Sequence, residues 1–181
     1  TGIMNNHTLC AYALGKLLVA KAKTLRDHTN VNLDKSVKKS VSVSGRSLFR
    51  TNQTNTTSSV MESTLSEALN LLRQACNDGN IHAMHTLAML YSEGIERPHI
   101  HTPVVANYIL APDHTSALSL FVCAAYRGHQ LCALLAGHTC YQLDGGLHAR
   151  SSGQIKAAFM YALAAGLHEA SSLQGLSYGT S

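Results

Sequence analysis

The sequence predicts an all-α fold: a short α/α-hairpin solenoid of about three repeats that follows a polar, basic N-terminal arm. Small residues recur at fixed distances from three glycines, as they do in helical repeats. Hydrophobic residues make up 45% of the 181 residues and charged residues 13%, so much of the chain is expected to be buried. We expect a helix at 1–26, a polar basic linker or extended arm at 27–61, and the repeats at 62–181 with an insertion at 95–116.

The helix at 1–26 is predicted from the mainly apolar run at residues 9–20. This run resembles the second helix of a repeat, with Cys10 and Gly15 at small-residue positions, and is interpreted as the remnant of an upstream unit. It is too short to cross a bilayer and is interrupted by Lys16, so no membrane span is expected. Residues 27–61 are rich in Ser, Thr, Asn and Lys and are expected to bury too little apolar surface to fold alone.

The helical hairpins are predicted around Gly79, Gly128 and Gly166, each of which separates two apolar helical runs where a hairpin needs a turn. Thr64 and Glu67 form a capping-box pattern, which predicts that the first hairpin begins near Leu65. All three prolines fall within 95–116, so that insertion is expected to be a loop. Small residues flank each turn and allow close helix packing. The repeat-defining residues are Ala75, Gly79, Ala83, Ala88, Tyr91, Ala124, Gly128, Cys132, Gly137, Ala162, Gly166, Ala170, Gly175 and Tyr178.

The first unit, Ala75-Gly79-Ala83-Leu87-Ala88-Tyr91, resembles the Sel-one-like repeats, which are relatives of the tetratricopeptide repeats. The third unit matches almost as well, whereas the second has Ala136 and Cys140 in place of the leucine and the tyrosine. The resemblance implies a right-handed superhelix with a concave face, a scaffold or adaptor role, and no catalytic residues. Residues 117–121 also look like part of a pentatricopeptide repeat, a family that binds single-stranded RNA, and this alternative stays open.

Catalytic and metal-binding patterns were weighed against this prediction. Residues 175–179 match G-x-S-x-G, but no strand is predicted before them and no acid or histidine follows. His82 and His85 share a predicted helix face, His99 and His101 form a loop pair, and Cys132, His138 and Cys140 lie close in sequence. A zinc site needs four convergent ligands, and no paired ligand spacing occurs. We therefore expect no enzyme, no metal, no cofactor and no small-molecule substrate.

The five cysteines, at positions 10, 76, 123, 132 and 140, are odd in number and lack a C-x-x-C pair. They lie in apolar helical patterns, so they are interpreted as small buried residues in a reducing compartment.

Basic residues concentrate at the N-terminus: residues 1–50 contain nine Lys or Arg and two Asp, whereas residues 51–181 contain five Lys or Arg and eight Asp or Glu. Such an arm is either a solvated tail or a segment that contacts phosphates or an acidic protein face. The candidate contacts with RNA or an acidic partner are Lys16, Lys21, Lys23, Arg26, Lys35, Lys38, Lys39, Arg46 and Arg50.

These observations predict a non-catalytic protein–protein interaction scaffold, a structural subunit of a large assembly. The specific expectation is a mitochondrial ribosome or another mitochondrial ribonucleoprotein, with other protein subunits as partners and RNA on the basic arm. The expected location is mitochondrial, and otherwise a reducing intracellular compartment. Two alternatives stay open: a free-standing adaptor that binds client proteins or peptides, of the secretory quality-control type, and a pentatricopeptide-like RNA-binding protein.

Overall fold

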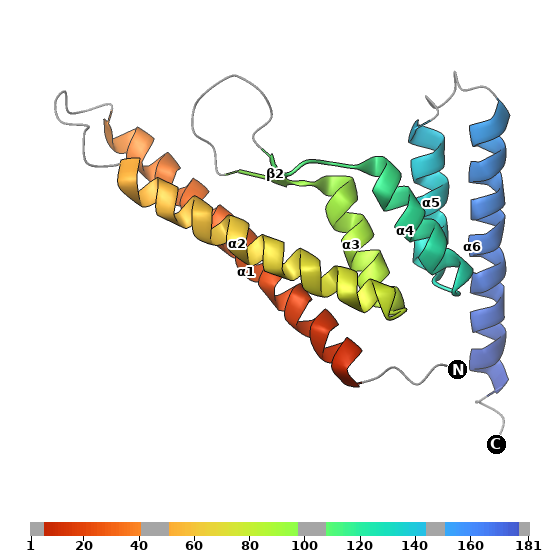
Figure 1. Ribbon diagram of the computed structural model, residues 1–181. Coiled ribbons are helices and arrows are strands. Elements are labelled where there is room, and N and C mark those ends of the chain that lie inside the picture. Colours follow the sequence, from red (N-terminus) through yellow and green to blue (C-terminus); the bar gives the residue numbers. More distant parts are fainter. Residues whose placement is uncertain (1–5, 41–50, 98–107, 144–150, 178–181) are drawn as a thin grey trace. The chain divides into compact units, whose positions relative to one another are not determined.

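A computed structural model of the chain describes residues 6–40, 51–97, 108–143 and 151–177, and the structural statements below concern these ranges. They form six helices and one short antiparallel strand pair, so the predicted all-α fold is confirmed (Figure 1). The elements are α1 (Asn6–Ser40), α2 (Thr51–Asn77), α3 (Ile81–Glu93), β1 (Ile95–Glu96), β2 (Tyr108–Leu110), α4 (His114–Tyr126), α5 (Gln130–Leu143) and α6 (Ser151–Ser177). The chain divides into two compact units, each described by itself, and the superhelical solenoid stays a prediction.

Unit 1 contains α1, α2 and the strand pair. The helices α1 and α2 pack side by side and antiparallel (Figure 1). Their approach is close because Gly15 faces Leu72: a Cβ at position 15 would lie 3.0 Å from Leu72 Cγ. One end of the pair is tied by the Thr8 hydroxyl, which donates a 3.2 Å hydrogen bond to Asp78.

The insertion is closed at its base by the strand pair, in which Ile95 is opposite Leu110. Ile95 is buried, and Arg97 forms a 3.0 Å ion pair with Glu62 of α2. Residues 95–97 and 108–111 of the insertion therefore belong to unit 1, whereas residues 112–116 belong to unit 2, where α4 begins at His114, before the predicted insertion ends.

Unit 2 contains α3, α4, α5 and α6, and each of these helices packs against the next along the chain. The only fully buried aromatic side chain among the described residues is Phe121 of α4. Around it the buried positions are mostly alanine and cysteine, which brings the helices close together. The start of α4 is capped by Asp113, whose carboxylate accepts hydrogen bonds from the backbone N–H groups of Thr115 and Ser116.

Two of the three predicted turn glycines are confirmed. Gly79 and Gly128 have φ of +89° and +93°, in the left-handed region that glycine adopts without steric cost. After α4, the N–H groups of Gly128 and His129 donate to the carbonyls of Ala125 and Ala124, which is the Schellman arrangement of a helix end. The Arg127 guanidinium donates a 2.9 Å hydrogen bond to the Gly79 carbonyl and so links the two turns.

The hairpin predicted around Gly166 is wrong, because Gly166 lies inside the continuous helix α6. Asn80 and His129 follow the two confirmed turn glycines, and each accepts a hydrogen bond from a backbone N–H of the next helix. Gly166 is followed by Leu167, which cannot cap a helix start. A lone glycine within a run of helix-forming residues costs only about 1 kcal/mol, so the helix continues.

Two expectations about residues 27–67 are also corrected. The capping box is not used: α2 begins at Thr51, and the Thr64 hydroxyl donates instead to the Val60 carbonyl one turn earlier. Residues 27–40 and 51–61 are helical, as parts of α1 and α2, rather than extended. Adding residues to an existing helix is far easier than nucleating one, so two packed helices can extend into polar sequence.

Candidate functional site

The basic residues of the N-terminal arm that the structure describes lie on one helix. Lys16, Lys21, Lys23 and Arg26 lie in the first two-thirds of α1, and Lys35, Lys38 and Lys39 lie in its last turns. Arg46 and Arg50 fall outside the described residues. The structure thus gathers seven of the nine predicted contact residues on one helix.

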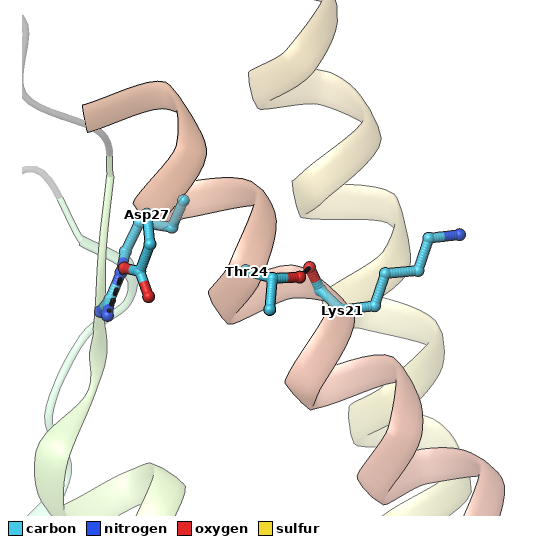
Figure 2. Close-up of polar contacts among 4 residues, drawn as sticks. Lys21, Thr24 and Asp27 are labelled. Atoms are coloured by element: carbon cyan, nitrogen blue, oxygen red, sulfur yellow. Dashed lines mark hydrogen bonds and ion pairs between the residues drawn. The ribbon is translucent and has the colours of Figure 1, made fainter. Parts of the chain in front are cut away.

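Near its middle, α1 exposes charge on several sides. The Lys16 ammonium lies 5.9 Å from the centre of the Tyr12 ring. Figure 2 shows the Lys21 side chain extended from α1, while its carbonyl accepts a 2.8 Å hydrogen bond from the Thr24 hydroxyl. The Arg26 guanidinium is bound to Asp27 at 3.0 Å and is therefore partly neutralised. In the N-terminal half of α1, the exposed cations are Lys16 and Lys21.

The N-terminal half of α1 also carries an apolar face that is not packed. The face toward α2 is made by Thr8, Ala11, Gly15, Val19 and Ala22, all of which are buried. On the side away from α2, the exposed residues between Leu9 and Ala20, apart from Lys16, are all apolar: Leu9, Cys10, Ala13, Leu14, Leu17 and Ala20. We call these six residues the α1 outer face. Leu17, at its centre, is 67% exposed.

A second unpacked apolar face lies on α6. The buried residues of this helix are Gly153, Ala157, Met160 and Ala164, which repeat at intervals of three or four and lie on the side that packs against α5. On the opposite side Ile155 and Phe159 are 66% and 55% exposed. We call Ile155, Phe159, Ala162 and Gly166 the α6 outer face.

The repeat-defining residues separate into two groups. In unit 2, Ala83, Ala88, Ala124, Cys132 and Gly137 are buried, as the repeat predicts. Gly137 lies directly under Tyr161 of α6, because a Cβ there would lie 2.8 Å from the tyrosine ring. Ala162, Gly166 and Ala170 are exposed on α6, Gly175 lies in its last turn, and Tyr178 falls outside the described residues. The small residues of the third unit therefore form an outer surface rather than a hairpin interface.

Three histidines form a cluster in unit 2 that sequence reasoning found only in part. The rings of His85 and His129 are stacked with centroids 5.1 Å apart, and His82 meets His129 edge-on at 5.9 Å. His129 was missed, although it follows a turn glycine at the offset where Asn80 follows Gly79. Its Nδ1 accepts a 3.2 Å hydrogen bond from the Cys132 N–H, which fixes the ring at the start of α5.

The electrostatics of this cluster favour neutral imidazoles. Burial lowers the pKa of His85, and the nearby His129 and His82 lower it further. Burial also lowers the pKa of His129, with His82 adding to the effect. Protonation would place positive charges on touching rings in a partly dry environment, so the folded state resists it.

The other candidates for chemistry do not assemble. Among the described residues, no group of three or more His, Cys, Asp or Glu is placed to hold a metal ion. Burial raises the pKa of Cys132 to about 12, which disfavours the thiolate that binds metals. Two of the cysteines expected to be buried, Cys10 and Cys123, are exposed. Gly175 and Ser177 of the G-x-S-x-G match lie in the last turns of a helix, whereas a nucleophile elbow follows a strand.

No family model matches this chain, and no curated protein shows significant sequence similarity to it. The resemblance to the Sel-one-like repeats therefore stays a prediction from the residues themselves. None of the helices that the structure describes is both long enough and apolar enough to cross a membrane.

The histidine cluster predicts that unit 2 loses stability as the pH falls. Because the folded-state pKa of His85 and of His129 lies below the ordinary histidine value of 6.5, the unfolded chain binds more protons at pH values between the two. The stabilisation is thus complete above the unfolded pKa and is lost as the pH falls through the folded pKa values. Urea unfolding followed by circular dichroism, compared at neutral and mildly acidic pH, measures the loss.

The double variant His85→Gln/His129→Gln is expected to flatten this pH dependence. His168→Gln, on an exposed position of α6, serves as the control and is expected to keep it. Asp113 does not interfere, because its hydrogen bonds to Ser116 and Thr115 lower the pKa of its carboxyl, whose titration therefore lies at more acidic pH. An unchanged pH dependence in the double variant would show that the cluster is not its source.

Proposed function

We propose that this protein is a non-catalytic scaffold that holds other protein subunits in a larger assembly. The observation that carries the proposal is the α6 outer face, where Ile155 and Phe159 expose most of their apolar surface. An isolated exposed leucine is ordinary on a soluble protein, but a continuous apolar face along a helix marks an interaction surface.

The partner that fits this face is a helix of another subunit. On its buried side α6 presents Gly153, Ala157 and Ala164, and α5 packs against that side. Its outer side also combines small and large residues: Ala162 and Gly166 are exposed on the same side as Ile155 and Phe159. Small residues between large ones permit the close helix approach that ridges-into-grooves packing requires. A partner helix would therefore extend the helical array by one layer.

The specific assembly that we propose is a mitochondrial ribosome or another mitochondrial ribonucleoprotein. What supports it is the concentration of seven lysines and arginines on α1, in a chain whose other helices suit protein contacts. Phosphate contacts would draw on those basic residues of α1 that do not neighbour its apolar face, whereas subunit contacts would use the apolar faces. The two kinds of contact are separable by experiment.

Sedimentation of the gently purified native protein tests the proposal. We expect the chain to travel in a particle much heavier than a monomer, and Phe159→Ser to shift it toward the free fraction. Tyr126→Ser, which removes an exposed aromatic residue from α4, is the matched control and is expected to leave the particle intact. Nuclease treatment that breaks the particle identifies it as a ribonucleoprotein. Migration of the wild-type protein as a free monomer would contradict the scaffold.

A further inference from the structure

We infer that the α1 outer face is a second docking site, and that its occupant is an amphipathic helix of a partner protein whose apolar stripe is bordered by Asp and Glu. This inference rests on the proposed scaffold function and names the chemistry of one partner. It concerns unit 1 alone, and the α6 outer face plays no part in it.

The α1 outer face has the make-up of a helix-packing surface. It combines three large exposed residues, Leu9, Leu14 and Leu17, with three small ones, Cys10, Ala13 and Ala20. Each of these positions lies three or four residues from another member of the set, and the set extends over about three helical turns. Protruding leucines separated by small residues are the surface into which the side chains of a second helix fit.

The helix α1 is held in place by α2 on the side opposite the α1 outer face. Its other face packs against α2 so closely that a Cβ on Gly15 would lie 3.0 Å from Leu72. The hydrogen bond from Thr8 to Asp78 is on this packed side. The outer face is thus presented on a rigid support rather than on a loose helix, which reduces the entropy lost on binding.

Charge also favours one kind of partner. The first 26 residues contain no Asp or Glu, the exposed Lys16 precedes Leu17 directly, and the exposed Lys21 follows Leu17 one helical turn later. A helix that seats its leucines on this face would bring its own flanking positions next to these ammonium groups. Carboxylates at those positions complement them, whereas lysines would repel them. The charges thus select an acidic partner, and the leucines supply most of the affinity.

A protein helix fits the face better than RNA or a lipid surface does. RNA contact places lysines and arginines, and not leucines, at the centre of the surface. Helices that lie in a membrane interface insert large aromatic or aliphatic residues and turn a polar face to water. Here half of the outer face is small residues, and the reverse face of α1 is covered by α2.

The test uses the full chain and two synthetic helical peptides that share one leucine stripe and differ only in flanking residues, all Glu in one and all Lys in the other. Binding is measured by fluorescence anisotropy. We expect the Glu peptide to bind about tenfold or more tightly than the Lys peptide, and to weaken as salt rises from about 0.15 M to about 1 M. Leu17→Ser is expected to abolish the binding of both peptides.

The charge reversal Lys16→Glu/Lys21→Glu is expected to invert the preference, so that the Lys peptide binds more tightly. Lys156→Glu, on an exposed position of α6, makes a charge change of the same kind elsewhere and is expected to change nothing. Circular dichroism confirms that each variant is folded.

Three results would overturn the inference. The first is equal binding of the two peptides, or no binding of either. The second is cosedimentation with phosphatidylserine vesicles that requires Leu17, which would assign the face to a lipid surface. The third is binding of a single-stranded RNA that requires Lys16 and Lys21 but not Leu17. Because Phe159 is untouched in all of these assays, failure here is distinct from failure of the scaffold proposal, which the Phe159→Ser sedimentation reports.

Discussion

Phe121→Ala is expected to lower the free energy of unfolding of unit 2 by about 3–5 kcal/mol. Phe121 is 1% exposed and is the largest fully buried side chain among the described residues. The other buried residues of α4 are all alanines, so no other buried side chain of this helix is large enough to fill the cavity. A loss of this size is a large part of the total stability of a typical domain.

Equilibrium unfolding in urea, followed by circular dichroism, measures this loss. Tyr126→Ala is the matched control, because it truncates an aromatic residue on the same helix that is 65% exposed, and it is expected to change stability by less than about 0.5 kcal/mol. Equal losses in the two variants would contradict the placement of Phe121 in the core.

Gly15→Leu and Leu72→Ala are each expected to destabilise unit 1. The double variant is expected to lose less stability than the sum of the two single losses. Leu72→Ala removes a fully buried side chain, at a cost of about 2–5 kcal/mol. Gly15→Leu forces a side chain against Leu72 Cγ and Cδ2, which lie 3.0 and 3.2 Å from the new Cβ, at a cost of about 1–3 kcal/mol. In the double variant the new leucine extends into the space that Leu72 leaves.

The double-mutant cycle is expected to show a coupling energy of about 1 kcal/mol or more in favour of the double variant. Full compensation is not expected, because the Ala68 carbonyl oxygen lies 3.3 Å from the new Cβ and belongs to the backbone. Leu17→Ala combined with Leu72→Ala is the control: Leu17 is on the outer face, so these two effects are expected to add. Additive losses for Gly15→Leu and Leu72→Ala would show that the two residues do not meet.

The turns show how far local sequence predicts this fold. Gly79 and Gly128 were found from spacing alone, and both adopt the left-handed conformation. Gly166 has the same spacing, yet it remains helical because no helix-capping residue follows it. The repeat pattern contains no information about that residue. Asn80 and His129 supply that cap after the other two glycines. The residue that follows each glycine therefore distinguishes the two turns from the continuous helix.

The α1 and α6 outer faces are harder to predict, because an apolar helical sequence does not indicate which side of the helix is packed. Residues 9–20 were correctly expected to be helical, but their apolar residues include both the buried Ala11 and Val19 and the exposed Leu14 and Leu17. Only the position of α2 decides between them. The histidine cluster was incomplete for a similar reason, since His129 reaches His82 and His85 through the packing of α3 against α4 and the turn after α4.

Hydroxyl-radical footprinting shows whether the α6 outer face holds a partner, when the native assembly is compared with the purified chain. We expect Ile155 and Phe159 to be oxidised readily in the purified chain and to be protected in the assembly. Tyr126, which is similarly exposed and lies outside the proposed docking faces, is predicted to be oxidised equally in both. Equal oxidation of Phe159 in the two samples would contradict the claim that this face holds a partner.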